Sequence, residues 1–198
     1  MLVFWKEKIV LLAVPKTGTT ALERALAPRA STAILAPPGL KHTSARRYRR
    51  EVAPWLTRDG AWPHETVAVI REPLDWLGSW YRYRRRSQID GSDTSTADID
   101  FESFVAAWLQ PKPPAFARIG SQARFLTGGR GRLLVQHLFR YEEFDHLLSF
   151  LADRLGAPVR VPQANVSPKE GLTLSNDLEA HLRKAAARDF ELWESAGR

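Results

Sequence analysis

The chain has 198 residues, 44% hydrophobic and 26% charged, which are ordinary proportions for a single globular domain. Its 29 Lys and Arg residues against 22 Asp and Glu residues give a net charge of +7, concentrated in residues 1–86 and attractive to an anionic ligand. Cysteine is absent, which excludes a disulfide framework, a thiolate nucleophile and a cysteine-ligated metal site. The first apolar run, 9–14, is too short to span a membrane and lacks a signal-peptide pattern, so we expect a cytoplasmic protein.

Apolar runs and amphipathic segments alternate along the chain. The apolar runs predict strands at 8–14, 32–36, 66–70 and 132–139. The amphipathic patterns predict helices at 19–26, 44–56, 73–86, 101–109, 119–126, 142–155 and across 178–193, with Pro54 ending or kinking the second. The polar segment at about 87–100 predicts a mobile loop. We therefore expect one α/β domain over residues 1–198, with three layers in which helices flank a central parallel sheet.

A lysine, a glycine and three threonines stand where the first predicted strand gives way to the first helix. A turn there aims unpaired backbone N–H groups and the positive end of the helix dipole at one point. Gly18 lets a ligand approach the backbone, Lys16 adds a full charge, and Thr17, Thr19 and Thr20 offer hydroxyl donors. The segment predicts an anion-binding loop. The alternative is a plain helix start with a solvated lysine.

A second strand-to-helix junction carries an arginine and a hydroxyl. Arg71 follows the predicted strand 66–70, and Pro73 stands in the first turn of the next helix. Open α/β sheets bind ligands beyond the carboxyl ends of their strands, so Arg71 should reach the same edge as Lys16. Ser79 lies about two helical turns beyond Arg71 and faces nearly the same way. An arginine fork with a hydroxyl suits a second phosphate group.

Neither junction has the pattern of a nucleoside-triphosphate kinase. The nucleotide loop of such enzymes has a glycine several residues earlier and ends in Gly-Lys-Ser/Thr, whereas here Lys16 precedes Gly18. A magnesium-dependent kinase is also expected to end the second strand in an aspartate, and here it ends in Arg71. A small-molecule kinase stays as the second enzyme hypothesis.

Together the two motifs resemble the sulfotransferase superfamily that uses 3′-phosphoadenosine 5′-phosphosulfate (PAPS). Residues 16–20 look like the family's 5′-phosphosulfate loop, and Arg71-Glu72-Pro73 with Ser79 and Tyr81 looks like its 3′-phosphate motif. Weaker matches lie at 121–122, 140–142 and 165–167, so the resemblance covers about residues 8–195. The nearest branch is that of the carbohydrate sulfotransferases, including bacterial members without a membrane anchor. One departure is that the late Gly-x-x-Gly-x-x-Lys segment of the cytosolic small-molecule branch is missing.

The resemblance implies a P-loop-like fold and transfer of a sulfuryl group to a hydroxyl of a carbohydrate-like or metabolite acceptor. Lys16 would neutralise the leaving oxygen, and the rest of the loop would hold the 5′-phosphate. Arg71 with Ser79 would hold the 3′-phosphate, and Asn165 and Ser167 would add contacts to the donor. No metal is implied, because a sulfuryl group carries less negative charge than a phosphoryl group.

The resemblance also implies a general base, placed after the second strand. His42 follows the Pro-Pro-Gly turn and would take the acceptor's proton. Glu72 is the alternative base, although beside Arg71 we expect it to form an ion pair. The other histidines have no such context, and we expect them to be structural.

Two arginine runs, 46–50 and 82–86, stand apart from these motifs. We expect an electropositive rim that attracts the nucleotide and, among candidate acceptors, an anionic glycan. No helix-turn-helix or aromatic-interleaved pattern accompanies the runs, so we expect no specific nucleic-acid partner. An arginine-rich protein that binds RNA or another polyanion remains the non-enzyme alternative.

Overall fold

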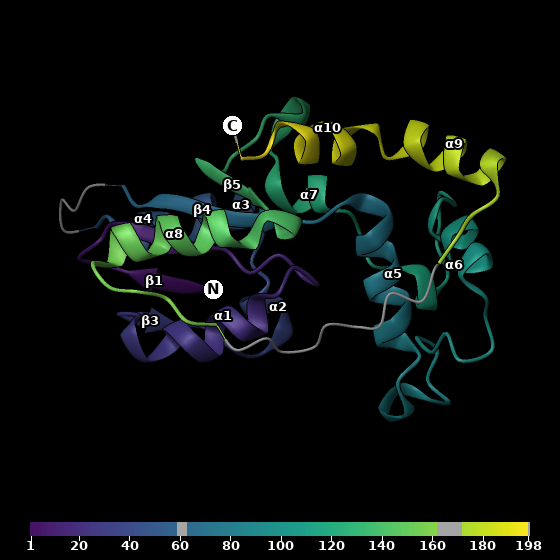
Figure 1. Cartoon of the computed structure of the whole chain (residues 1–198), viewed down its shortest axis with the longest axis horizontal. Helices are drawn as coiled ribbons and strands as arrows, with labels where there is room; N and C mark the ends of the chain where they lie inside the picture. The colour runs from purple at the N-terminus through teal and green to yellow at the C-terminus, as the bar shows by residue number, and fades with distance from the viewer. Residues whose placement is uncertain (59–62, 162–171, 198) are drawn as a thin grey trace.

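Figure 1 shows the computed structural model, which describes residues 1–58, 63–161 and 172–197. Five strands form one sheet in the order β3-β1-β2-β4-β5. Their bounds are β1 (Leu2–Phe4), β2 (Ile9–Leu11), β3 (Thr32–Ala33), β4 (Glu65–Ile70) and β5 (His137–Arg140). The four predicted strands are found, three of them shorter than expected.

The sheet is mixed, which corrects the expectation of a parallel one. Strands β2, β4 and β5 run parallel, as predicted. The strand β1 was missed, and it pairs antiparallel with both β2 and β3. Residues 2–4 form too short an apolar run to stand out in the sequence, and they become a strand because a hairpin lays them against residues 9–11.

The helices follow the predicted order. The α-helices are α1 (Thr19–Leu26), α2 (Pro38–Lys41), α3 (Ala45–Arg47), α4 (Ala53–Leu56), α5 (Pro73–Arg84), α6 (Phe101–Trp108), α7 (Gln122–Leu126), α8 (Phe144–Leu155), α9 (Asn176–Ala185) and α10 (Ala187–Ser195). Shorter helical turns are η1 (Ala27–Arg29), η2 (Tyr48–Val52), η3 (Ser87–Ile89), η4 (Ala115–Ala117), η5 (Gly129–Gly131) and η6 (Tyr141–Glu143).

Two predicted helices are interrupted. The helix 44–56 contains the π-turn η2, where the N–H of Ala53 donates to the carbonyl of Tyr48. A wider turn is a common response where a proline, here Pro54, removes a helical N–H donor. The predicted C-terminal helix is divided at Ala186 into α9 and α10.

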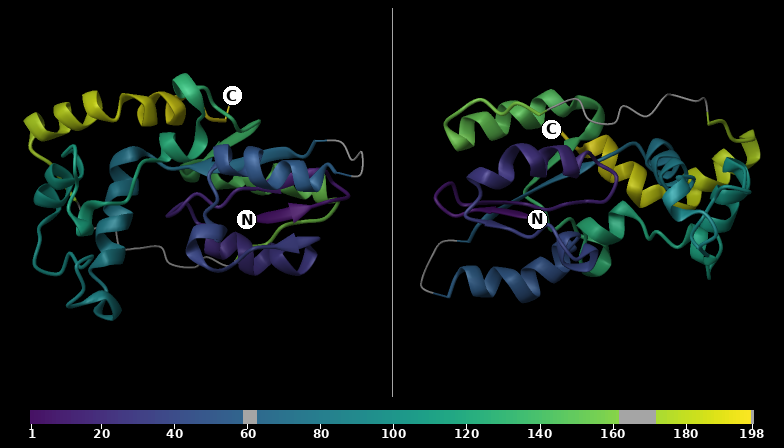
Figure 2. Two further views of the ribbon diagram at one scale, coloured as in Figure 1. Left: turned by 180° about the vertical axis from the view of Figure 1, so that it is seen from behind. Right: turned by 90° about the horizontal axis from the view of Figure 1, so that it is seen from below.

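Helices cover both faces of the sheet because side chains alternate along each strand. Ile9 and Leu11 point to the face covered by α1 and α8, together with Val67 and Val69 of β4. Val10 and its even-numbered neighbours point to the other face, covered by the helix 45–56, α7 and α10. The view from below in Figure 2 shows the sheet between α8 on one side and α4 on the other.

A third apolar cluster lies beyond the carboxyl ends of the parallel strands. It is made by α5, α6, α9 and the first half of α10, which extend away from the sheet in Figure 1. The predicted mobile loop is tied to this cluster at its far end, where Thr96 donates to the carbonyl of Tyr81 at 2.9 Å and the Tyr81 hydroxyl donates to that of Ile99 at 2.8 Å. Within the described ranges, no helix combines the length and apolar character that crossing a membrane requires.

Candidate anion-binding site

The predicted anion loop is built by a glycine in the left-handed region. Gly18 has φ of 77° and directly precedes α1. A Cβ at this position would be strained by the left-handed backbone, and it would also lie tightly against the rings of Tyr141 at 3.2 Å and Phe144 at 3.3 Å. The backbone N–H groups of residues 16–20 donate to no acceptor among the described residues. These N–H groups are unpaired hydrogen-bond donors at the start of an eight-residue helix.

The threonines of the loop do not play equal parts. Thr17 is fully buried, and its hydroxyl donates to the carbonyl of Val14 at 2.9 Å. That hydroxyl therefore stabilises the turn and does not face a ligand, which differs from the donor role expected for it. Thr19 is buried and Thr20 is exposed at the helix start.

Lys16 lies among aromatic rings and other cations. Its Nζ is 4.0 Å from the ring centre of Tyr83 and 5.7 Å from that of Trp80, both on α5. Burial lowers the pKa of Lys16 to about 8, and the positive charges of Arg86, Arg71 and Arg82 add to the effect. No carboxylate of the described residues lies within ion-pair distance of it. A cluster of this kind favours an anion, whose negative charge would raise the pKa of Lys16 again.

Arg71 joins the second motif to the first. One guanidinium nitrogen donates to the carbonyl of Lys16 at 3.3 Å, and the guanidinium stacks 4.4 Å from the ring centre of Tyr141. The indole of Trp76 donates to the carbonyl of Pro15 at 2.9 Å. Residues 15–16 and 71–76 therefore meet at one edge of the sheet, as the order of strands β2 and β4 predicts. Ser79 is half-buried two turns along α5.

Sequence reasoning missed a buried hydrogen-bond network that holds Arg71 in place. The side chain of Gln122 accepts from the Arg71 N–H at 2.9 Å and donates to the Arg71 carbonyl at 2.7 Å. The N–H groups of Gln122 and Ala123, at the start of α7, both donate to one carboxylate oxygen of Asp189, at 2.9 and 3.1 Å. Burial raises the pKa of Asp189 to about 6, although these hydrogen bonds oppose the rise. The only signal in the sequence was Gln122 at a predicted helix start.

Glu72 does not pair with Arg71, contrary to expectation. Its carboxylate caps α5 by accepting from the N–H of Asp75 at 2.7 Å, and its own N–H donates to Glu142 at 2.9 Å. Burial raises the pKa of Glu72, and the charges of Asp75 and Glu142 raise it further. Arg71 instead pairs with Asp75. As a helix cap, Glu72 is a poor candidate for a general base.

His42 lies at the same edge of the sheet, next to the end of β2. Its Nδ1 is 2.7 Å from the carbonyl of Ala13. A carbonyl only accepts, so Nδ1 carries the proton and Nε2 is left with its lone pair. Burial lowers the pKa of His42, and the nearby charge of Lys41 contributes to the lowering. The lowered pKa favours the neutral ring, with the proton on Nδ1, which is the tautomer that a general base needs.

The structure places the two arginine runs differently. Arg82 and Arg86 lie close enough to Lys16 for their charges to act on it. Arg84 is buried and donates to the carbonyl of Ala115 at 2.6 Å, a purely structural contact. The run 46–50 lies on another face, over a cleft of about 350 Å³ lined by Arg46, Arg49, Arg50, Gly128, Gly129 and Leu134.

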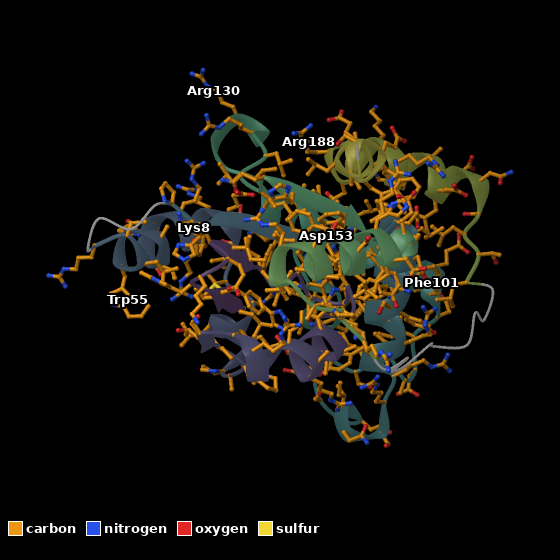
Figure 3. The ribbon with its side chains drawn as sticks, turned by 60° about the vertical axis from the view of Figure 1, so that its left-hand side comes forward. Lys8, Trp55, Phe101, Arg130, Asp153 and Arg188 are labelled. Atoms are coloured by element: carbon orange, nitrogen blue, oxygen red, sulfur yellow. The ribbon has the colours of Figure 1, made fainter. Side chains whose placement is uncertain are left out.

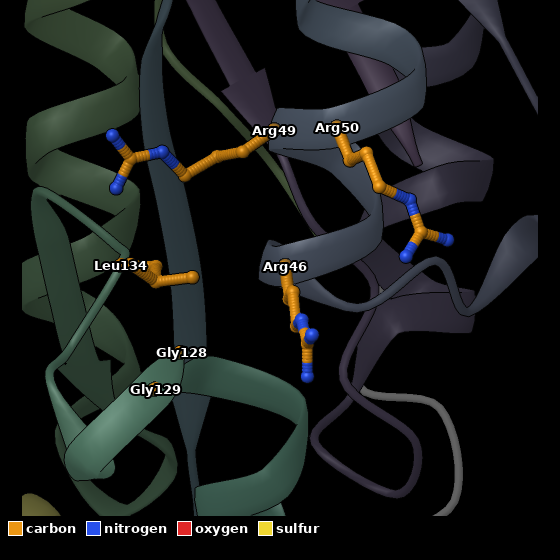
Figure 4. Close-up of a pocket in the computed structure, with 6 residues that line it drawn as sticks. All are labelled: Arg46, Arg49, Arg50, Gly128, Gly129 and Leu134. Atoms are coloured by element: carbon orange, nitrogen blue, oxygen red, sulfur yellow. The ribbon is translucent and has the colours of Figure 1, made fainter.

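Figure 4 shows Arg46, Arg49 and Arg50 on one helical segment at the edge of this cleft, with Leu134, Gly128 and Gly129 on the segments opposite. An adjoining cleft of about 440 Å³ reaches Thr66 and Gln136, at the amino ends of β4 and β5. Nearby, Arg130 projects away from the body of the protein (Figure 3). None of the predicted site residues lines either cleft. The arginine run 46–50 is therefore a separate surface, and not a rim of the anion site.

Two predicted contact residues, Asn165 and Ser167, lie outside the described residues. The remaining predicted residues, 16–20, His42, Arg71 and Ser79, all lie on the segments that follow β2 and β4 or beside the end of β2. No protein-family model matches the chain, and neither the curated proteins nor the solved structures contain a significant match to it.

Proposed function

We propose that this protein is a sulfotransferase that moves a sulfuryl group from PAPS to a hydroxyl of a carbohydrate-like or metabolite acceptor. The observation that carries the proposal is the junction of the two motifs. Lys16 and Arg71, from two separate strand ends, are joined by a hydrogen bond of 3.3 Å beside the unfilled amides of residues 16–20. Two adjacent anion sites suit a nucleotide with phosphate at both its 3′ and 5′ positions.

The same proposal includes the fold family and the location. Parallel strands β2, β4 and β5, helices on both faces, and an anion loop directly after β2 support a P-loop-like domain. We further propose that the protein works in the cytoplasm.

Each group in the site has a distinct task in this reaction. The oxygen of the acceptor forms a bond to sulfur, and the bond from sulfur to the bridging oxygen of the 5′-phosphate breaks. Lys16 stabilises the charge that gathers on that bridging oxygen, and its own low pKa rises when the anion arrives. The amides of residues 16–20 hold the 5′-phosphate, and Arg71 with Ser79 holds the 3′-phosphate.

His42 takes the proton that the acceptor loses. Its Nε2 has the free lone pair, since Nδ1 is used by Ala13. The lowered pKa keeps the ring neutral near pH 7, so that it is ready to accept the proton. Removal of a general base costs about 100- to 10,000-fold in rate, so His42→Ala should bind nucleotide normally and lose most transfer activity.

Nucleotide binding tests the proposal before any acceptor is known. Adenosine 3′,5′-bisphosphate at 100 times its dissociation constant should stabilise the protein by about 2.7 kcal/mol, which raises the melting temperature by roughly 5 to 10 °C. ATP with magnesium should have a much smaller effect. Arg71→Ala should lose about 2 kcal/mol of bisphosphate binding, whereas Arg183→Ala, on the exposed face of α9, should bind normally. Equal or greater stabilisation by ATP would refute the proposal.

One observation supports the polyanion-binding alternative. Arg46 and Arg49, which line the cleft in Figure 4, have no carboxylate partner among the described residues. Binding of arbitrary RNA that weakens linearly with the logarithm of salt, without any bisphosphate binding, would favour that function.

A further inference from the structure

A carboxylate lies between two arginines beside the site. Arg71 donates from Nε to one oxygen of Asp75 at 2.7 Å, and a terminal nitrogen of the guanidinium lies at ion-pair distance, 2.7 Å, from the same oxygen. The other oxygen of Asp75 is 3.5 Å from a terminal nitrogen of Arg82. Asp75 thus bridges two guanidinium groups, in the manner of a bound oxyanion.

Arg82 has donor capacity that the protein does not use. Its Nε is buried and has no hydrogen-bond partner among the residues that the structure describes. A Cβ at Gly78 would lie 3.3 Å from the Arg82 guanidinium and 2.9 Å from Leu172, so the missing side chain at 78 makes the room that Arg82 occupies. An idle buried guanidinium donor is costly unless a ligand uses it.

The helix α5 presents these groups together with a hydroxyl. Asp75, Ser79 and Arg82 are spaced by four and three residues, which places them on one face of the helix. Asp75, the first of these three residues, forms an ion pair with Arg71. Two guanidinium groups therefore flank the position that the Asp75 carboxylate now fills, and Ser79 lies one turn further along the same face of α5.

The exposures show which group can leave. The Asp75 side chain is 45% exposed, whereas those of Arg71 and Arg82 are 12% and 18% exposed. Asp75 can turn toward water at little cost, while the two arginines are held by their surroundings. A phosphate monoester has three terminal oxygens and nearly two negative charges, so it can satisfy more of these donors than a carboxylate can.

We propose that Arg82 is a second guanidinium of the 3′-phosphate subsite, and that Asp75 occupies that subsite in the free protein and is displaced by the phosphate. This inference rests on the proposed function for the statement that the ligand is a nucleotide 3′-phosphate. The statement that the ligand is an anion rests on the two arginines alone. Asp75 holds Arg71 and Arg82 in position before the ligand arrives, and it lowers the affinity that they would otherwise show.

Calorimetric titration of matched ligands tests the inference. Adenosine 3′,5′-bisphosphate and adenosine 5′-monophosphate differ only in the 3′-phosphate. Arg82→Gln should weaken bisphosphate binding by about 10- to 100-fold and monophosphate binding by less than about threefold. Asp75→Asn should strengthen bisphosphate binding by about 3- to 10-fold, because it removes the competing charge. Arg183→Gln and Asp177→Asn make the same charge changes on α9, and they should leave the affinity for both ligands unchanged.

The outcomes separate this inference from the proposed function. If the wild type prefers the bisphosphate and Arg82→Gln retains that preference, the inference is wrong and the proposed function stands. If the wild type does not bind the bisphosphate, the proposed function fails, and inorganic phosphate becomes the probe. Phosphate binding that is weakened by Arg82→Gln and strengthened by Asp75→Asn would still support the subsite. Absence of phosphate binding by the wild type would overturn it, and so would phosphate binding that Arg82→Gln does not weaken or that Asp75→Asn does not strengthen.

Discussion

Replacement of Gln122 by methionine removes the clamp on Arg71 while it keeps the length and volume of the side chain. Gln122 is fully buried, and its amide makes hydrogen bonds of 2.9 and 2.7 Å to the N–H and carbonyl of Arg71. Each partner left unpaired costs about 1 to 3 kcal/mol, and water that reaches the partly buried Arg71 backbone keeps the cost toward the lower end. We therefore expect Gln122→Met to lose about 2 to 4 kcal/mol of unfolding free energy.

The measurement is urea unfolding followed by linear extrapolation, together with a thermal melt. A loss of this size lowers the melting temperature of a domain this long by roughly 4 to 16 °C. Gln88→Met, at an exposed loop position, is the matched control and should stay within about 0.5 kcal/mol of wild type. Bisphosphate affinity should fall in Gln122→Met as well, because Arg71 loses its fixed position. If Gln122→Met is as stable as the control variant, the clamp does not hold Arg71 in solution.

Two further predictions concern pH. Bisphosphate affinity should be constant from pH 7 to about 8 and then fall up to tenfold per pH unit, because the pKa of Lys16 in the free protein is about 8 and only the charged form attracts the ligand. Lys16→Arg should abolish the fall. A flat profile to about pH 9.5 in the wild type would place Lys16 away from the ligand. Burial raises the pKa of Asp189 to about 6, so the folded protein favours the protonated carboxyl. The contribution of this group to the free energy of unfolding is therefore complete below its ordinary pKa and is lost as pH rises through about 6. Unfolding measured from pH 4 to 7 should show Asp189→Asn gaining on the order of 2 kcal/mol over wild type as pH rises, and parallel curves would contradict this assignment.

The anion loop shows how far local sequence reaches. Apolar residues followed by Lys16 to Thr20 predict a strand, a turn and a helix, and α1 begins and ends where the pattern places it. The conformation of Gly18 is a local property as well, because a left-handed residue before a helix favours glycine. The role of Thr17 was not predictable in this way. Its hydroxyl can face a ligand or the backbone of Val14, and only the packed turn decides between them.

Hydrogen bonds between distant segments could not be predicted from the sequence. Gln122 and Asp189 are polar residues of common types, and nothing in their sequence spacing connects them to Arg71. The hydrogen bonds from Gln122 span 51 residues, and those to Asp189 span 66 and 67. The missed ion pair is a local one. Glu72 is nearest to Arg71 along the chain, but its carboxylate caps the start of α5, and Asp75, four residues after Arg71, pairs with the guanidinium instead.

The amino-acid sequence by itself determined the succession of strands and helices, the two strand-to-helix junctions and the residue types that they carry, because periodicity, glycine and proline act over a few neighbouring residues. The tertiary structure alone decided the antiparallel strand β1, the separation of the arginine run 46–50 from the anion site, and the hydrogen bond from Arg71 to the carbonyl of Lys16. These depend on how the sheet is ordered and on which buried polar groups find partners across it. Such choices minimise unpaired donors and exposed apolar surface over the whole domain, and no short segment contains the information to make them.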